Sequence, residues 1–162
     1  MRFQSSAATL ALAVVAVLGL AGPAAAGEQV PFKGRLEGDV TITPLVPPFV
    51  SVLVDATGNA TQLGQFTLAI PHIVNRADRT AIGSYHFTAA NGDTLSADFT
   101  GVAMPTATPG VLAIVETATI SGGTGRFAGA IGSFTAERLF DTIAGTTTGS
   151  FEGTISSPGA VR

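Results

Sequence analysis

The feature that most constrains the fold of this chain is an alternation of apolar and polar residues that recurs in short segments. Between Phe32 and Ile42, every second residue is apolar or glycine, and the residues between them are charged or threonine. Successive side chains of a β-strand point to opposite faces, so this period of two predicts a strand with one buried and one solvated face. Residues 146–155 repeat the pattern, and no amphipathic helix of useful length is apparent.

Glycine, proline and asparagine divide the chain into eight such segments. We predict strands at Phe32–Ile42, Phe49–Asp55, Leu63–Val74, Thr80–Ala89, Asp93–Ala103, Val111–Ile120, Gly132–Phe140 and Thr146–Ile155. The links between them are short: Thr57-Gly58-Asn59 indicates a turn after the second strand, and Asn91-Gly92 is a strong hairpin signal. Glycines in phase with the apolar positions, such as Gly34 and Gly149, favour a barrel over a sandwich because they let strands coil sharply. The sequence therefore predicts an all-β fold, an eight-stranded antiparallel, up-and-down, calycin-like barrel with room for side chains or one small ligand.

The first 26 residues have the pattern of an export signal. Arg2 precedes an uncharged apolar run from Ala7 to Leu20, and Ala24-Ala25-Ala26 supplies the small residues that a signal peptidase needs. The apolar run is too short to span the ~30 Å of a bilayer core comfortably. We therefore predict a signal peptide at 1–26, a mature domain at 27–162 and secretion to the extracellular space or cell envelope. An uncleaved N-terminal anchor is the alternative.

Charge and composition argue against several classes of partner. Removing the predicted signal takes away Arg2 and no acid, so the formal charge of −3 becomes one unit more negative. An acidic surface repels phosphate backbones, and we expect no nucleic-acid partner. No second apolar stretch could cross a membrane, so we expect no stable membrane insertion after cleavage. The chain has no cysteine, which excludes disulfides and thiolate chemistry.

The two histidines, His72 and His86, do not suggest a metal site. A third ligand such as Asp98 or Glu116 would be needed, and nothing in the spacing brings one close. We expect surface or rim histidines, no bound metal and no cofactor. No serine lies in a G-x-S-x-G nucleophile elbow, so a serine hydrolase is unsupported as well.

Glu116 is the one weak candidate for a catalytic residue. It shares a strand face with Leu112, Ile114, Ala118 and Ile120. If that face lines the barrel, the carboxylate is desolvated, and such groups cluster at functional sites. If Val111, Val115 and the threonines point inward instead, Glu116 is solvated. Strand parity does not choose between the two faces, and the solvated arrangement is the simpler expectation.

The glycine-rich segment Ser121–Gly129 directly follows a predicted strand. Its G-x-G-x-x-x-G spacing is similar to a dinucleotide-binding turn, but such a turn needs a helical crossover of a dozen or more residues. The next predicted strand begins at Gly132, which leaves too little chain for a helix. We expect a tight connection instead, with a positive φ at Gly125.

The same segment resembles a known family. ISGGTGRFAGAIGSFTAE, residues 120–137, is similar to the strand–GGTG–[KR]F–x–x–A–x–G–strand signature of the dirigent and allene oxide cyclase barrel superfamily, in particular its small secreted bacterial members. FTAANGDTLSADFTG, residues 87–101, and FEGTIS, residues 151–156, resemble the same bacterial proteins. The matching motif positions are structural: Gly122, Gly123, Gly125, Arg126, Phe127 and Gly132. The resemblance implies an eight-stranded antiparallel barrel, trimeric in many plant members, whose lumen steers or catalyses the cyclisation and coupling of reactive small molecules.

Two functions are compatible with these patterns. The first is a non-enzymatic barrel with a binding or structural role, whose partners would be a small apolar ligand and further copies of itself. The second is a dirigent-like or allene-oxide-cyclase-like cyclase or isomerase that acts on a small reactive molecule in the lumen. A lumen lined only by apolar residues and glycine would favour the first function. Two or more converging ionisable groups would favour the second.

Overall fold

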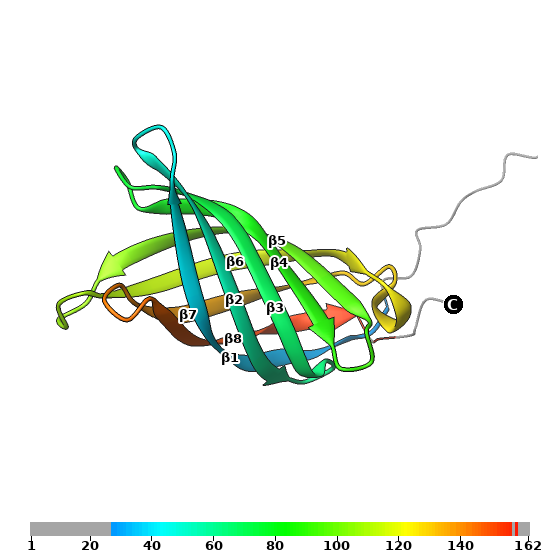
Figure 1. Ribbon diagram of the computed structural model, residues 1–162. Helices are drawn as coiled ribbons and strands as arrows, with labels where there is room; N and C mark the ends of the chain where they lie inside the picture. The colour runs from blue at the N-terminus through cyan, green and yellow to red at the C-terminus, as the bar shows by residue number, and fades with distance from the viewer. Residues whose placement is uncertain (1–26, 157, 159–162) are drawn as a thin grey trace, which may run out of the picture.

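The computed structural model describes residues 27–156 and residue 158, and the predicted signal peptide at 1–26 lies outside them. The chain forms a closed barrel in which each strand pairs antiparallel with its sequence neighbours and the last strand pairs with the first (Figure 1). The strands are β1 (Gln29–Pro44), β2 (Phe49–Ala60), β3 (Gly64–Asn75), β4 (Thr80–Ala89), β5 (Thr94–Pro105), β6 (Val111–Gly123), β7 (Gly132–Asp141) and β8 (Thr146–Ser156). The predicted eight-stranded antiparallel barrel is confirmed.

Strand β2 is longer than the sequence predicted. Thr57-Gly58-Asn59 was expected to form a turn, but these residues continue the ladder with β1 and β3. Gly58 faces the interior, where a Cβ would overlap the carbonyl oxygen of Arg35 and the ring of Phe66. This glycine therefore allows two strands to approach closely rather than reversing the chain. The reversal comes later, at Gln62, which has a φ of 67°.

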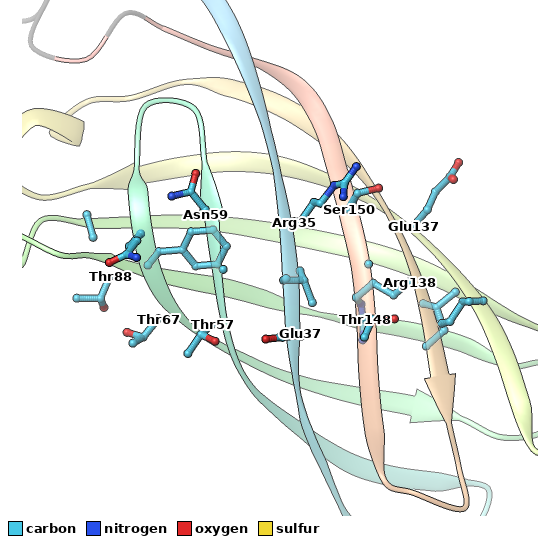
Figure 2. Close-up of a pocket in the computed structure, with 18 of the residues that line it drawn as sticks. Arg35, Glu37, Thr57, Asn59, Thr67, Thr88, Glu137, Arg138, Thr148 and Ser150 are labelled. Atoms are coloured by element: carbon cyan, nitrogen blue, oxygen red, sulfur yellow. The ribbon is translucent and has the colours of Figure 1, made fainter.

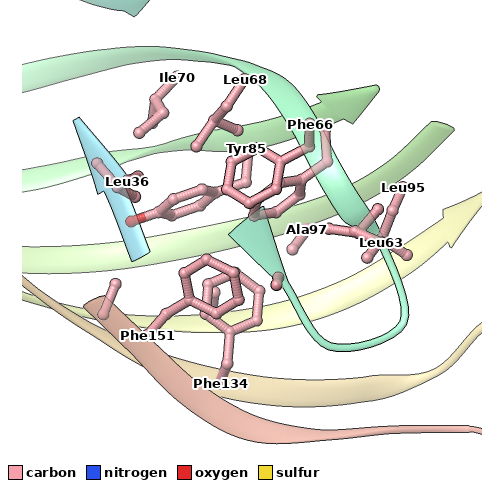
Figure 3. Packing of buried hydrophobic residues seen from close by; sticks show 14 of the residues in the cluster. Leu36, Leu63, Phe66, Leu68, Ile70, Tyr85, Leu95, Ala97, Phe134 and Phe151 are labelled. Carbon is pink, nitrogen blue, oxygen red and sulfur yellow. The ribbon is translucent and has the colours of Figure 1, made fainter. Parts of the chain in front are cut away.

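An aromatic cluster fills the half of the barrel that holds the ends of the described chain. Its members are Phe32, Phe66, Tyr85, Phe87, Phe134 and Phe151, all at most 4% exposed. Their rings contact one another with centroid separations from 5.0 to 6.2 Å, several of them edge to face (Figure 3). Close packing of this kind leaves this half of the interior without space for a ligand.

The glycine-rich motif closes the end of this half. Between β6 and β7 lies a single 3-10 turn, η1 (Gly125–Phe127), and the side chain of its last residue, Phe127, is fully buried. The predicted positive φ at Gly125 is confirmed at 57°, and a Cβ there would overlap the carboxylate of Asp93. Arg126 lies over the Phe127 ring at 4.9 Å and donates to the carbonyl of Leu63 at 3.3 Å. No helix among residues 27–156 is long and apolar enough to cross a membrane.

The opposite end, which we call the mouth, carries the β1–β2, β3–β4, β5–β6 and β7–β8 turns. In Figure 1 the tips of the first two hairpins diverge from the tips of the last two, whereas the η1 end is compact. The two ends of one barrel therefore differ in how tightly the interior is closed.

Candidate functional site

Between the aromatic cluster and the mouth, the barrel interior changes from apolar to polar. Four side chains from four different strands meet there: Tyr85 of β4, Glu116 of β6, Arg138 of β7 and Thr147 of β8. We call this set the luminal cluster. All four residues are at most 3% exposed. Figure 3 shows the Tyr85 hydroxyl pointing away from Phe66, so this one side chain belongs to both the aromatic and the polar region.

The expectation that Glu116 is solvated is wrong. Glu116 is 1% exposed and lies on the inward face of β6 together with Ala118 and Ile120. Its partner across the ladder on β5 is Gly101, and a Cβ at that glycine would lie 2.7 Å from the Glu116 Cγ. The missing side chain on β5 leaves the space that the glutamate occupies. A catalytic role for Glu116 stays a prediction.

Arg138 completes the site and was missed by the sequence analysis. It alternates in phase with Phe134 and Ala136, both buried, so it is a cation on the apolar face of a strand. Glu116 is likewise a charged residue on the apolar face of a strand, with the opposite charge. Each of the two buried charges therefore needs the other as its ion-pair partner. Searching for oppositely charged residues on two apolar strand faces would have found the pair.

The pair has the geometry of a strong ionic hydrogen bond. The Arg138 Nη2 donates to Glu116 Oε1 at 2.6 Å and its Nε donates to Oε2 at 3.0 Å, which makes the contact bidentate. The Tyr85 hydroxyl also donates to Oε2. The remaining terminal nitrogen, Nη1, donates to the Thr147 hydroxyl at 3.2 Å, which in turn donates to the carbonyl of Leu139 at 2.9 Å.

Protonation of the luminal cluster follows from this geometry. Burial alone would lower the pKa of Arg138, but the hydrogen bonds and charge of Glu116 outweigh burial and raise that pKa. Burial raises the pKa of Tyr85 well above its ordinary value, and the adjacent Glu116 charge adds to the effect. Arg138 therefore stays cationic and Tyr85 stays protonated, so the phenol acts as a donor.

His72 of β3 also faces the interior, whereas we expected a surface or rim residue. It is 8% exposed, its ring packs edge to face on Phe99 at 5.7 Å, and its Nδ1 lies 2.9 Å from the carbonyl oxygen of Ile70. His86 is exposed on the outer face, as expected, with Nδ1 3.3 Å from the Ser96 hydroxyl. Within residues 27–156, no three His, Asp or Glu side chains are grouped closely enough to hold a metal ion.

Beyond the luminal cluster, Val50 and Val52 of β2 face inward and are buried, each at 6% exposure, but a further set of inward-facing apolar side chains at the mouth is only partly covered. We call this set the mouth rim: Val40, Val74, Ala81, Ala103, Leu112, Ile114 and Phe140. Each has an intermediate exposure, in contrast with the fully buried inward residues of the η1 half. The turns around the rim add exposed apolar side chains, with Val46 81% and Ile143 84% exposed.

A hollow lies on the outside of the barrel. It follows one cross-strand row over β6, β7, β8, β1, β2, β3 and β4, and Figure 2 labels polar residues along it, among them Arg35 and Glu137. Apolar residues such as Leu36 and Leu139 also line it, as does Arg138 of the luminal cluster. Four of the lining residues are threonines: Thr57, Thr67, Thr88 and Thr148. Thr57, Thr67 and Thr88 lie opposite one another across β2, β3 and β4, and threonine pairs of this kind stabilise a sheet.

Comparison with known proteins establishes the fold and nothing finer. No protein-family model matches the sequence, and no curated protein sequence matches it. The solved structure of the pterocarpan synthase dirigent protein PsPTS1 is similar with a TM-score of 0.58 and 13% identity, covering 81% of this chain and 96% of that one. The pterocarpan synthase dirigent protein GePTS1 is similar with a TM-score of 0.56 and 16% identity, covering 85% and 95% respectively. This chain therefore has a dirigent-like β-barrel fold.

Proposed function

We propose that this protein is an exported, non-enzymatic barrel that binds a small, mainly apolar molecule at its mouth. The observation that carries the proposal is the division of the interior. The η1 half is filled by the aromatic cluster, whereas the mouth rim leaves inward-facing apolar side chains partly exposed. A ligand that contacts the mouth rim would bury this apolar surface, and small-molecule sites are typically lined by apolar side chains with a few polar groups.

Binding is favoured over catalysis because the acid of the luminal cluster is buried and accepts three hydrogen bonds. Both oxygens of Glu116 accept hydrogen bonds from Arg138, and one also accepts from Tyr85. A general base needs a lone pair within reach of the substrate proton, and Glu116 is only 1% exposed. Freeing the carboxylate would break a buried ion pair, which costs several kcal/mol.

A second candidate function is a luminal cyclase or isomerase. One observation favours it: Tyr85, Glu116 and Arg138 converge inside the barrel, and His72 faces the same interior, so the lumen is not purely apolar. Two proteins of similar fold are named pterocarpan synthases. In this candidate, a substrate oxygen would replace one of the present partners of Glu116 or Arg138.

Fluorescence titration with a neutral apolar probe, N-phenylnaphthylamine, tests the binding proposal. We expect saturable binding to the mature domain, weakened by about tenfold or more in Leu112→Glu, because a rim carboxylate would have to be desolvated by the probe. The matched control is Ile82→Glu, at an outward position that is 63% exposed, where affinity should not change. Equal losses in both variants, or no saturable binding, would contradict the proposal. Turnover of a reactive substrate that Glu116→Gln abolishes without loss of stability would support the second candidate instead.

Export is tested separately. Expression of the full chain in a secreting host, followed by intact-mass analysis of the medium or envelope fraction, should show a protein that begins at or near Gly27. A full-length product recovered with the membrane fraction would show that the N-terminal segment is an anchor.

A further inference from the structure

We propose that His72 is the polar recognition residue of the mouth, and that the ligand is a neutral, mainly apolar molecule with a hydroxyl or N–H that donates to His72 Nε2. The inference rests on the proposed binding function and specifies the class of ligand.

The hydrogen bond of the ring defines which nitrogen is available. His72 Nδ1 lies 2.9 Å from the carbonyl oxygen of Ile70, and a carbonyl oxygen can only accept. Nδ1 therefore carries the proton, and in the neutral ring Nε2 has a free lone pair. Packing against Phe99 and close approach to Gly83, where a Cβ would overlap the His72 side chain, hold the ring in this orientation.

The free nitrogen is accessible. Within residues 27–156, no protein group is found in a hydrogen bond with His72 Nε2, and every fully buried side-chain nitrogen or oxygen has a partner. Because Nε2 has no hydrogen-bond partner and no fully buried nitrogen lacks one, Nε2 is not fully buried. The 8% exposure of the residue agrees with this. The ring thus offers one acceptor next to the apolar mouth rim.

The surrounding charges favour a neutral ligand. Burial lowers the pKa of His72 and the Arg138 charge lowers it further, against the raising effects of the Ile70 carbonyl and Glu116, so the ring is neutral at pH 7. The charged groups of the luminal cluster, Glu116 on β6 and Arg138 on β7, neutralise each other at 2.6 Å, and Tyr85 on β4 is protonated. An ionic ligand would lose its hydration without finding an unpaired countercharge, whereas a neutral donor gains a hydrogen bond without that cost.

Three probes of similar size test the inference: naphthylmethanol, its methyl ether and naphthoate. Calorimetric titration of the mature domain should show the alcohol binding about fivefold to tenfold more tightly than the ether, which lacks the donor, with naphthoate weakest. His72→Phe should remove the preference for the alcohol while leaving ether affinity within about twofold. His72→Gln, which retains an acceptor, should restore part of the preference. Acidification well below the ordinary histidine pKa of 6.5 should abolish it, because protonation removes the lone pair.

The NMR chemical shifts of the imidazole nitrogens distinguish a ligand-binding histidine from a merely structural one, because only the former should respond to the ligand. Addition of the alcohol, but not the ether, should shift the His72 Nε2 resonance in the direction of an accepted hydrogen bond. Binding without an alcohol preference, or a preference that survives in His72→Phe, overturns the inference and leaves the binding proposal standing. Failure of all three probes to bind overturns both.

Discussion

The two halves of the barrel interior bury their contents in opposite ways. In the η1 half, aromatic rings pack with centroid separations of 5.0 to 6.2 Å. The stability of this half comes from buried apolar surface and from ring–ring contacts. In the mouth half, a carboxylate, a guanidinium and a phenol are buried and satisfy one another. The first arrangement depends on volume, and the second depends on every partner being present. That contrast predicts different responses to substitution in the two halves.

The largest effect is expected in the aromatic half. Phe87 is fully buried and its ring contacts Phe32, Phe66 and Phe134 among others. Phe87→Ala should lower the free energy of unfolding by about 4 kcal/mol, since it removes a large apolar side chain and leaves a cavity. Phe87→Leu, which retains most of the volume, should lower it by clearly less. Chemical denaturation measures both, and equal losses would show that volume is not what matters here.

In the mouth half, removal of one charge should cost nearly as much although fewer apolar contacts are lost. Arg138→Met leaves Glu116 buried without its cation and should lower the free energy of unfolding by about 3 kcal/mol. The double variant Glu116→Leu with Arg138→Met should recover most of that loss, because a buried ion pair can be replaced by apolar residues. A double variant that is no more stable than Arg138→Met would contradict the view that stability in the mouth half depends on pairing of the buried charges.

A smaller loss of stability is expected at the η1 turn, which closes the end of the aromatic half. Gly125→Val places a branched side chain at a φ of 57° and against the Asp93 carboxylate. We expect a loss of about 2 kcal/mol in unfolding free energy. Ala128→Val, at a neighbouring exposed position with a negative φ, is the matched control and should change stability by less than about 0.5 kcal/mol. A thermal melt of Gly125→Val that coincides with the parent would contradict the prediction.

The smallest effect is a pH dependence confined to the mouth half. The pKa of His72 is lower in the folded state than the ordinary value of 6.5, so the unfolded chain binds a proton more readily. Stability from this residue is therefore complete above about pH 6.5 and falls as the pH drops from there through the lowered pKa. His72→Gln should reduce this loss, and His86→Gln on the outer face should not. Denaturation midpoints measured from about pH 8 to about pH 5 would show it.

The sequence predicted the strands better than the site because strand patterning is local. The alternation in β1 and β8 and the hairpin at Asn91-Gly92 identified elements that the structure contains. The exceptions were glycines with non-local roles. Gly58 appeared to mark a turn, but its lack of a side chain is needed by Arg35 and Phe66, residues on two other strands.

The period of two, the short links and the positive φ at Gly125 are properties of neighbouring residues, so the barrel and the tight η1 turn could be predicted without knowledge of distant contacts. The face that each strand turns inward, and therefore the site, was decided only by the tertiary structure. Glu116 meets Arg138 and Tyr85, which lie 22 and 31 residues away along the chain. The carboxylate can be buried at low free-energy cost only because the register of strands β4 to β7 places both partners beside it. A carboxylate on an apolar face is ambiguous until its partners are known, because the free energy of burying it depends on groups that no local pattern contains.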